Sequence, residues 1–329
     1  MSAIAWSVKQ FRVFPGIESH GLTLFPVVDD SPVKTDAFLT LQEALQAKLV
    51  EIAELTNASG PRFASGPRVN QLGIINNSDR PVILIAGEIV IGGMQDRVVG
   101  KDLILAPHAG PVPLNVFCVE HGRWHRTSNS FCSADSLMAE PSIRVSAMAD
   151  KNQAKVWDEV ERSQRVMADR FMAKGFALDC FDTTSYGKTM AHDDVQKEIR
   201  ETFDPATVRQ QFMTAVIGLG ACGLIAGVSG RCTWLELFAN DRLLDQYLPR
   251  LLQSFMVDAL RHGNASTAAP VPLERAESFL ADMSVEKETV QRENEVYEYH
   301  EGISARYRTF VLSSLLPGQE CEVHRVKVS

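Results

Sequence analysis

The sequence predicts an α+β protein, with a glycine-interrupted antiparallel or mixed β core and amphipathic helices packed on it. Two observations support this class. Short apolar runs, separated by glycines and turn residues, fill residues 20–124, which is typical of β-structure. From residue 148 onward, apolar side chains recur at helical spacing, and a second helical pattern follows residue 240.

The composition is that of a globular chain. Of 329 residues, 45% are hydrophobic and 22% are charged, which is enough to form a large core. The net charge of -8 argues against a general nucleic-acid binder, so we expect no nucleic-acid partner. Six scattered cysteines favour free thiols in a reducing compartment. The N-terminus has no signal-peptide pattern and no apolar run reaches the ~20 residues of a membrane span, so we expect a cytoplasmic protein without a membrane partner.

The first half of the chain reads mainly as strands. We expect the first strand at 21–28, and Thr40 with Glu43 forms a capping-box pattern before a short helix. Residues 50–55 either continue that helix or form a strand. A loop with two Gly-Pro dipeptides follows at 57–68. The later strands are expected as a strand–turn–strand over 69–87 and then at 97–99, 102–105 and 112–119.

The second half alternates helices and strands. Residues 125–147 carry no clear period and predict a long excursion or lid. The remaining elements are expected as helices at 148–173, 206–217 and 240–261, a hairpin over 221–238 that turns at Ser229-Gly230, a linker at 265–273, and closing strands at 297–299, 307–312 and 321–329. Pro249 predicts a kink or break in the third helix.

We predict one compact α+β domain over residues 1–262. The strands of 20–124 would form its core, and the hairpin at 220–238 would complete it. Residues 263–329 are polar at first and then alternate, which predicts a polar linker and a C-terminal extension with closing strands.

The segment GEIVIGGMQDR, residues 87–97, is a first candidate site. It lacks the G-x-G-x-x-G spacing of a dinucleotide-binding turn. In a functional interpretation, Glu88, Gln95 and Arg97 line a pocket, and the glycines allow backbone amides to approach a ligand. The alternative is a bulged hairpin in which Glu88 and Arg97 form an internal salt bridge.

The segment CVEHGRW, residues 118–124, is a second candidate site. Glu120, Arg123 and Trp124 have the chemistry to bind a polar, planar ligand, because arginine offers a bidentate fork and tryptophan a stacking face. In the alternative, Arg123 pairs with Glu120 and Trp124 caps the core.

Glu236 is a lone carboxylate in the apolar stretch TWLELF. Strand alternation puts Trp234, Glu236 and Phe238 on one face. Glu236 would then enter the same pocket as Glu88 and support acid–base work, or it would be a solvated residue of an edge strand.

Cys118, His121, His125 and Cys132 have ligand types that suit zinc. Their order is uncommon and Cys118 lies in an apolar strand, so we predict no metal site. The same reasoning disfavours a catalytic Cys118–His121 pair.

The two candidate segments together resemble a bacterial and archaeal family named for its association with ADP-ribosylglycohydrolases and rhodanese-phosphatases. The resemblance covers residues 20–262 and rests on the Gly-Glu, Gly-Gly-x-Gln-x-Arg and Cys-Val-Glu-x-Gly-Arg-Trp patterns. It implies a role near ADP-ribose, NAD or RNA-repair metabolism and carries no catalytic residues.

Three functional hypotheses follow. The first is a binding module for a nucleotide-like ligand related to ADP-ribose or NAD. Its site residues would be Glu88, Gln95, Arg97, Glu120, Arg123, Trp124 and Glu236, with the arginines on phosphates and the tryptophan on a base. The second is a hydrolase or transferase that uses Glu88 or Glu236 as the acid or base. The third is a structural scaffold, including a homo-oligomer. No cofactor follows from the sequence.

Overall fold

The computed structural model describes residues 11–33, 35–55, 70–123, 127–128, 130–174, 183–216, 220–262 and 269–329. The chain divides into two compact units. Unit 1 contains Met1–Asp36 and Arg200–Ser329, and unit 2 contains Ala37–Ile199. The boundary that the sequence predicts between residues 262 and 263 lies within unit 1. The expected loop at 57–68 lies outside the described residues, as do Trp124, His125 and Cys180.

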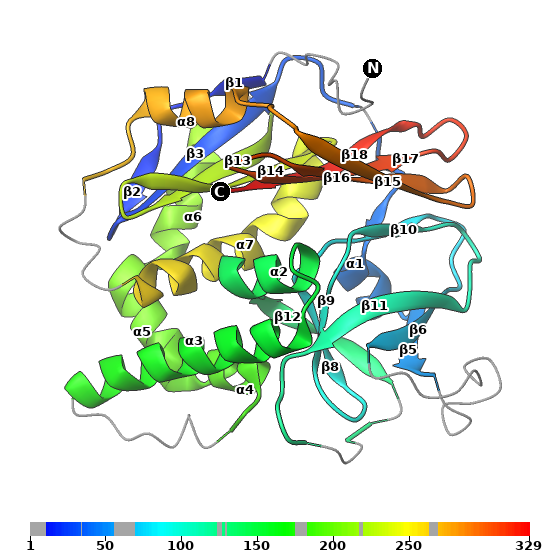
Figure 1. The fold of residues 1–329 in the computed structure, drawn as a ribbon, viewed down its shortest axis with the longest axis horizontal. Helices are drawn as coiled ribbons and strands as arrows, with labels where there is room; N and C mark the ends of the chain where they lie inside the picture. Colours follow the sequence, from blue (N-terminus) through cyan, green and yellow to red (C-terminus); the bar gives the residue numbers. More distant parts are fainter. Residues whose placement is uncertain are drawn as a thin grey trace. The chain divides into compact units, whose positions relative to one another are not determined.

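Unit 1 is built on one sheet, coloured blue, yellow-green and red in Figure 1. Its strand order is β1-β3-β13-β14-β18-β17-β16-β15, and β2 also pairs with β3. The bounds are β1 (Phe11–Val13), β2 (Ile17–Ser19), β3 (Leu22–Asp29), β13 (Ala221–Val228), β14 (Arg231–Phe238), β15 (Lys287–Glu293), β16 (Tyr297–Ile303), β17 (Arg308–Ser314) and β18 (Cys321–Val328). All its pairings are antiparallel.

The hairpin β13–β14 forms where the sequence predicts it. Ser229 and Gly230 turn the chain with φ of 51° and 79°, a left-handed pair that suits a tight hairpin. The hairpin was expected to complete the β core of residues 20–124. β13 does pair with β3, the first long strand of that range, whereas β14 pairs with β18 from the C-terminal strands. β14 is therefore an interior strand.

The C-terminal strands complete the same sheet. The expected closing strands are confirmed as β16, β17 and β18. β15 was not predicted, because its residues KETVQRE include one apolar side chain, Val290. Charged residues are common on exposed edge strands, where they discourage pairing with other chains.

Helices cover both faces of the unit 1 sheet, with α8 on one side and α7 on the other (Figure 1). The bounds are α6 (Pro205–Val216), α7 (Asp241–Arg261) and α8 (Leu273–Ala281). Phe279 of α8 packs in a cluster with Leu235 and Leu237. On the opposite face, Trp234 and Phe238 contact α7 through its aromatic residues. The expected break at Pro249 is absent, because α7 is continuous across it.

Unit 2 contains two smaller sheets, with strand orders β12-β8-β9-β11-β6-β5 and β10-β7-β4. The bounds are β4 (Leu39–Thr40), β5 (Val50–Glu54), β6 (Gln71–Asn76), β7 (Val82–Leu84), β8 (Glu88–Gly92), β9 (Arg97–Val99), β10 (Leu103–Leu105), β11 (Val112–Cys118) and β12 (Phe131–Met138). β4 and β7 are parallel, and the other pairs are antiparallel. The predicted α+β class with a mixed β core is confirmed.

Several helices of unit 2 begin at a residue whose side chain caps the first turn. The bounds are α1 (Leu41–Gln46), α2 (Pro141–Met148), α3 (Gln153–Ala173), α4 (Tyr186–Ala191) and α5 (Asp193–Phe203), and α5 contains the boundary between the units. The Thr40–Glu43 capping box is confirmed. The predicted amphipathic helix is confirmed as α3. It starts later than expected because Asn152 caps it, and it buries Val156 and Met167.

The expected lid at 125–147 was wrong where the structure describes it. Residues 131–138 form β12, which pairs with β8, and α2 follows directly. The register of this pair shifts between Ser133 and Met138. A bulge of this kind breaks the two-residue alternation on which strand prediction depends. Across the described residues, none of the helices combines the length and the apolar character required to span a bilayer.

Candidate functional site

The first candidate segment is a tight hairpin in which β8 turns into β9. Gly92 and Gly93 adopt φ of 138° and 54°. A Cβ atom on Gly93 would lie 2.3 Å from the ring of Phe131, and one on Gly92 would lie 2.6 Å from the carbonyl oxygen of Ser130. The glycines are thus required by the protein's own close packing against Ser128, Ser130 and Phe131.

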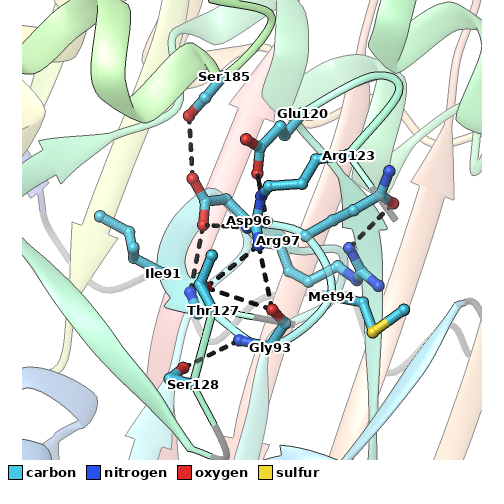
Figure 2. Close-up of polar contacts among 12 residues, drawn as sticks. Ile91, Gly93, Met94, Asp96, Arg97, Glu120, Arg123, Thr127, Ser128 and Ser185 are labelled. Carbon is cyan, nitrogen blue, oxygen red and sulfur yellow. Dashed lines mark hydrogen bonds and ion pairs between the residues drawn. The ribbon is translucent and has the colours of Figure 1, made fainter. Parts of the chain in front are cut away.

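An arginine from the second segment lies at the centre of the turn (Figure 2). Arg123 donates from Nε to Oε2 of Glu120 over 2.6 Å and from Nη2 to Oδ1 of Asp96 over 3.2 Å. Its Nη1 donates to the carbonyl oxygen of Gly93 and to Thr127. One guanidinium therefore joins both candidate segments, which residues 98–117 separate along the chain.

Asp96 is an acidic partner of Arg123 that is not among the predicted site residues. Its Oδ1 also accepts from the amide of Gly92, and its Oδ2 accepts from the hydroxyl of Ser185 over 2.9 Å. Burial raises the pKa of Asp96, and the nearby Glu120 carboxylate raises it further, whereas the hydrogen bonds and Arg123 oppose this shift. Asp96 and Glu120 are thus two carboxylates that share one buried cation.

The start of α4 docks on the second segment. The backbones of Ser185 and Glu120 form an isolated antiparallel β-bridge. The amide of Tyr186 donates to the carbonyl oxygen of Val119. Ser185 also caps α4, because its hydroxyl accepts from the amide of Lys188. The Lys188 ammonium lies 3.7 Å from Oε1 of Glu120. No sequence pattern connects residue 185 with residue 96, so this contact depends on the fold alone.

Gln95 and Arg97 form a second buried cluster in the same turn. Nη1 of Arg97 donates to Oε1 of Gln95 over 3.2 Å, and its Nη2 lies 3.6 Å from Oε1 of Glu54. Glu54 also accepts from the amide of Met94. The predicted alternative, an internal salt bridge between Glu88 and Arg97, named the wrong acid. The carboxylate beside Arg97 is that of Glu54.

Glu88 and Glu236 lie in different units. Glu88, in unit 2, accepts from the amide of Ile85 over 2.9 Å. Glu236, in unit 1, is fully buried and interacts with Nε1 of Trp234 and Nε2 of His324. The alternative of a solvated edge-strand carboxylate is wrong, because β14 is an interior strand. The shared face of Trp234, Glu236 and Phe238 is confirmed by the contacts of both aromatic rings with α7.

The predicted site residues are strongly buried. The six that the structure describes are each at most 9% exposed: Glu88, Gln95, Arg97, Glu120, Arg123 and Glu236. Trp124 lies outside the described residues. The fold brings Glu120 and Arg123 together and, separately, Gln95 and Arg97. Their charged groups bind other groups of the protein, which is the usual condition for buried charges.

An open groove lies beside the second segment, within unit 2. Its volume is about 320 Å³, and α3 supplies most of its wall. The lining includes Trp157, Asp158, Glu161 and Gln164 from α3, with His121 and Thr184 opposite. The rings of His121 and Trp157 meet edge to face with centroids 4.7 Å apart. His121 immediately follows Glu120, so the buried network and the groove share one stretch of chain.

Several contacts fix the groove wall. The side-chain amide of Gln153, at the start of α3, both accepts from the amide of Cys118 and donates to its carbonyl oxygen. The hydroxyl of Thr184 donates to the carbonyl oxygen of His121. Nε2 of Gln164 donates to Thr189 over 2.8 Å. The groove therefore combines aromatic surfaces with polar groups held by neighbouring backbone.

The described residues contain no cluster of three or more histidine, cysteine or acidic side chains arranged to hold a metal ion. His125 of the zinc-like spacing lies outside them. Burial raises the pKa of the Cys118 thiol, partly opposed by Arg97. A raised pKa disfavours the thiolate that a nucleophilic cysteine requires.

A comparison with protein families matches residues 10–326 to one family, the ARG and Rhodanese-Phosphatase-superfamily-associated Protein domain. No curated protein and no solved structure matches the chain. The family match covers both candidate segments, both units and the C-terminal strands. The chain therefore belongs to the ARG and Rhodanese-Phosphatase-superfamily-associated Protein domain family.

Proposed function

We propose that the protein is a binding module for a small nucleotide-like ligand, and that a planar ring of this ligand occupies the groove beside His121 and Trp157. The groove carries the proposal, because it is a concave surface beside the second candidate segment and includes His121 of that segment. Its volume of about 320 Å³ lies at the lower end of the range for small-molecule sites. That volume suits a single ring system with a sugar better than a whole dinucleotide.

The chemistry of the groove supports a ligand with hydrogen-bonding edges. Nε1 of Trp157 is buried and has no hydrogen-bond partner among the residues that the structure describes. Gln164 has its side-chain nitrogen bound to protein acceptors, whereas no described group donates to its carbonyl oxygen. One donor and one acceptor beside an aromatic side chain are the elements that recognise a heterocyclic base.

This proposal gives the arginines of the two candidate segments a structural role in place of the predicted contact with phosphates. Arg97 and Arg123 are at most 9% exposed, and both guanidinium groups already bind protein acceptors. Releasing either one to a phosphate would leave a buried carboxylate unpaired. We therefore assign Glu120 and Arg123 to positioning His121, and Glu88, Gln95 and Arg97 to bracing the hairpin.

Calorimetry tests the proposal with adenosine, ADP-ribose and NAD as probes. We expect binding that Trp157→Ala weakens by about five- to 150-fold, because base–aromatic stacking contributes about 1–3 kcal/mol. Met172→Ala is the matched control, since Met172 lies on the same helix, is 53% exposed and does not line the groove. Melting temperatures of both variants show whether they fold. Failure of the folded wild-type protein to bind any probe would reject the proposal.

The scaffold hypothesis has one observation in its favour, which is the burial of all described segment residues. It predicts no binding in the same calorimetric panel and no effect of Trp157→Ala. A turnover assay with the same probes tests the hydrolase or transferase alternative. Turnover lost in Glu88→Gln or Glu236→Gln would support it, whereas binding without turnover would reject it.

A further inference from the structure

We propose that the groove beside Trp157 selects a planar aromatic cation over a neutral or anionic ring of the same shape. The inference rests on the proposed function and names the chemical class that this site would prefer. It comes from the charges that line the groove and from the way those charges are paired.

Carboxylates are the charged groups of the groove lining. Asp158 and Glu161 both line it, whereas none of the described lining residues is a lysine or an arginine. Glu161 forms an exposed ion pair with Arg165 one turn further along α3. Asp158 has no ion-pair partner among the described side chains. The local field therefore favours positive charge, with Asp158 as its main source.

The neighbouring cations of α3 are engaged elsewhere. Lys155 pairs with Asp150 over 2.8 Å, and Arg162 pairs with Glu159 over 3.0 Å. Both cations line a separate groove between α2 and α3, which Asp158 also reaches. They moderate the potential around Asp158 but do not enter the lining of the groove beside Trp157.

The aromatic lining acts in the same direction. The face of an indole ring carries negative charge density and attracts cations, most strongly among the aromatic side chains. Trp157 is held by its edge-to-face contact with His121. An aromatic cation can stack on such a ring while its charge lies near Asp158. An anionic ring of the same shape would meet two carboxylates.

The expected preference is moderate because the carboxylates are exposed. An exposed ion pair and a surface cation–π contact together correspond to about a three- to thirtyfold change in affinity. Screening by salt reduces the ionic part, so the preference should shrink as ionic strength rises.

Three probes of nearly equal shape test the inference by calorimetry: the N-methylpyridinium-3-carboxamide cation, neutral pyridine-3-carboxamide and the pyridine-3-carboxylate anion. We expect affinity to decrease in that order, with the cation binding about tenfold more tightly than the neutral ring. Asp158→Asn should reduce this ratio several-fold, because it removes the negative charge that favours the cation. Asp169→Asn is the control, because Asp169 is exposed on the same helix and does not line the groove.

The outcomes separate this inference from the proposed function. Equal affinity for the cation and the neutral ring would overturn the inference, and so would an unchanged ratio in a folded Asp158→Asn variant. In either case the proposed function would stand if adenosine or ADP-ribose still bound in a Trp157-dependent way. Absence of binding by all three rings, with nucleotide binding intact, would also overturn the inference alone.

Discussion

The hydroxyl of Ser185 donates a 2.9 Å hydrogen bond to Oδ2 of Asp96, a residue 89 positions earlier in the chain. The same hydroxyl accepts from the amide of Lys188 and caps α4. Oδ1 of Asp96 accepts from Gly92 and Arg123. Asp96 thus connects the first hairpin, the second segment and α4, although burial and Glu120 both oppose its ionisation.

The first prediction concerns the pH dependence contributed by Asp96. Burial raises the pKa of Asp96 in the folded protein above its ordinary value of 3.8. As pH rises from 3.8 to the folded pKa, the native state retains a proton that the unfolded chain has lost. The stabilisation linked to this proton is complete below 3.8 and is lost as pH rises through the folded pKa.

Asp96→Asn removes this titration and keeps an oxygen to accept from Arg123. We expect the free energy of unfolding of wild type, minus that of the variant, to decrease as pH rises above about 4. Urea unfolding at several pH values measures this difference. A difference that stays constant across the range would contradict the assignment.

The second prediction concerns Arg123, the cation shared by Asp96 and Glu120. Arg123→Met leaves two buried carboxylates without the guanidinium that they share. We therefore expect the free energy of unfolding to decrease by roughly 3–5 kcal/mol. Arg123→Lys should lose less, because an ammonium keeps the charge but cannot reproduce the planar donor set.

Urea unfolding measures both Arg123 variants. Arg162→Met provides the control, since the side chain of Arg162 is 65% exposed and its ion pair should contribute under about 1 kcal/mol. Combining Asp96→Asn with Arg123→Met should recover part of the loss, because one of the unpaired charges is then absent. Additive effects of the two substitutions would show that the residues do not act as one network.

Local patterns explain which parts of the fold the sequence predicted. The Thr40–Glu43 capping box, the Ser229-Gly230 turn and the apolar stripe of α3 are each encoded within a few residues. β12 was missed because its register shift breaks the alternation. β15 was missed because an exposed edge strand needs few apolar residues.

The site was harder to predict because its partners are distant in sequence. Glu120 and Arg123 are three positions apart, and the sequence predicted their pairing as the alternative to ligand binding. Arg97 lies close to Glu88 in sequence, yet its acidic neighbour is Glu54 from β5. Asp96 belongs to the first candidate segment. Its contact with Ser185 could not be predicted from that segment, because it forms only when α4 packs there. Pairings of this kind depend on how strands and helices assemble.

The third prediction concerns Gly87, which precedes the buried Glu88. Its φ is +101°, and a Cβ atom there would lie 2.6 Å from Nε of Arg144. Arg144 is fully buried and donates from Nε to the carbonyl oxygen of Ala86. Gly87→Ala should therefore cost roughly 2–4 kcal/mol, from backbone strain and the displaced guanidinium together.

Gly318→Ala separates these two contributions. Gly318 has a φ of +76°, and no atom of the described residues lies within 4 Å of its added Cβ, so only backbone strain should remain, about 1–2 kcal/mol. Chemical unfolding of both variants gives the comparison. Equal losses would mean that the contact with Arg144 contributes nothing to the requirement for glycine at position 87.

The last prediction concerns Lys327, which is buried in unit 1 beneath α8. Its Nζ donates to the carbonyl oxygens of Phe279 and Asp282 and lies 3.9 Å from the ring centroid of Tyr307. Burial lowers the pKa of Lys327 to about 8, although Asp282 and Cys232 partly oppose the shift. Its ordinary value, expected in the unfolded chain, is 10.5.

Between about pH 8 and 10.5 the unfolded chain holds a proton on Lys327 that the folded protein has released. The free energy of unfolding therefore gains a contribution that grows with pH over this window, by about 2–3 kcal/mol in total. Cys232 acts in the opposite direction, because burial raises its pKa to about 11 and the folded protein retains that proton. The total stability curve contains both effects.

Lys327→Met isolates the lysine contribution. The free energy of unfolding of wild type, minus that of the variant, should rise from pH 8 to pH 10.5, because the thiol of Cys232 is present in both proteins. Lys287→Met on the exposed strand β15 should give a flat difference. A flat difference for Lys327→Met as well would mean that the ammonium keeps its ordinary affinity for protons beneath α8.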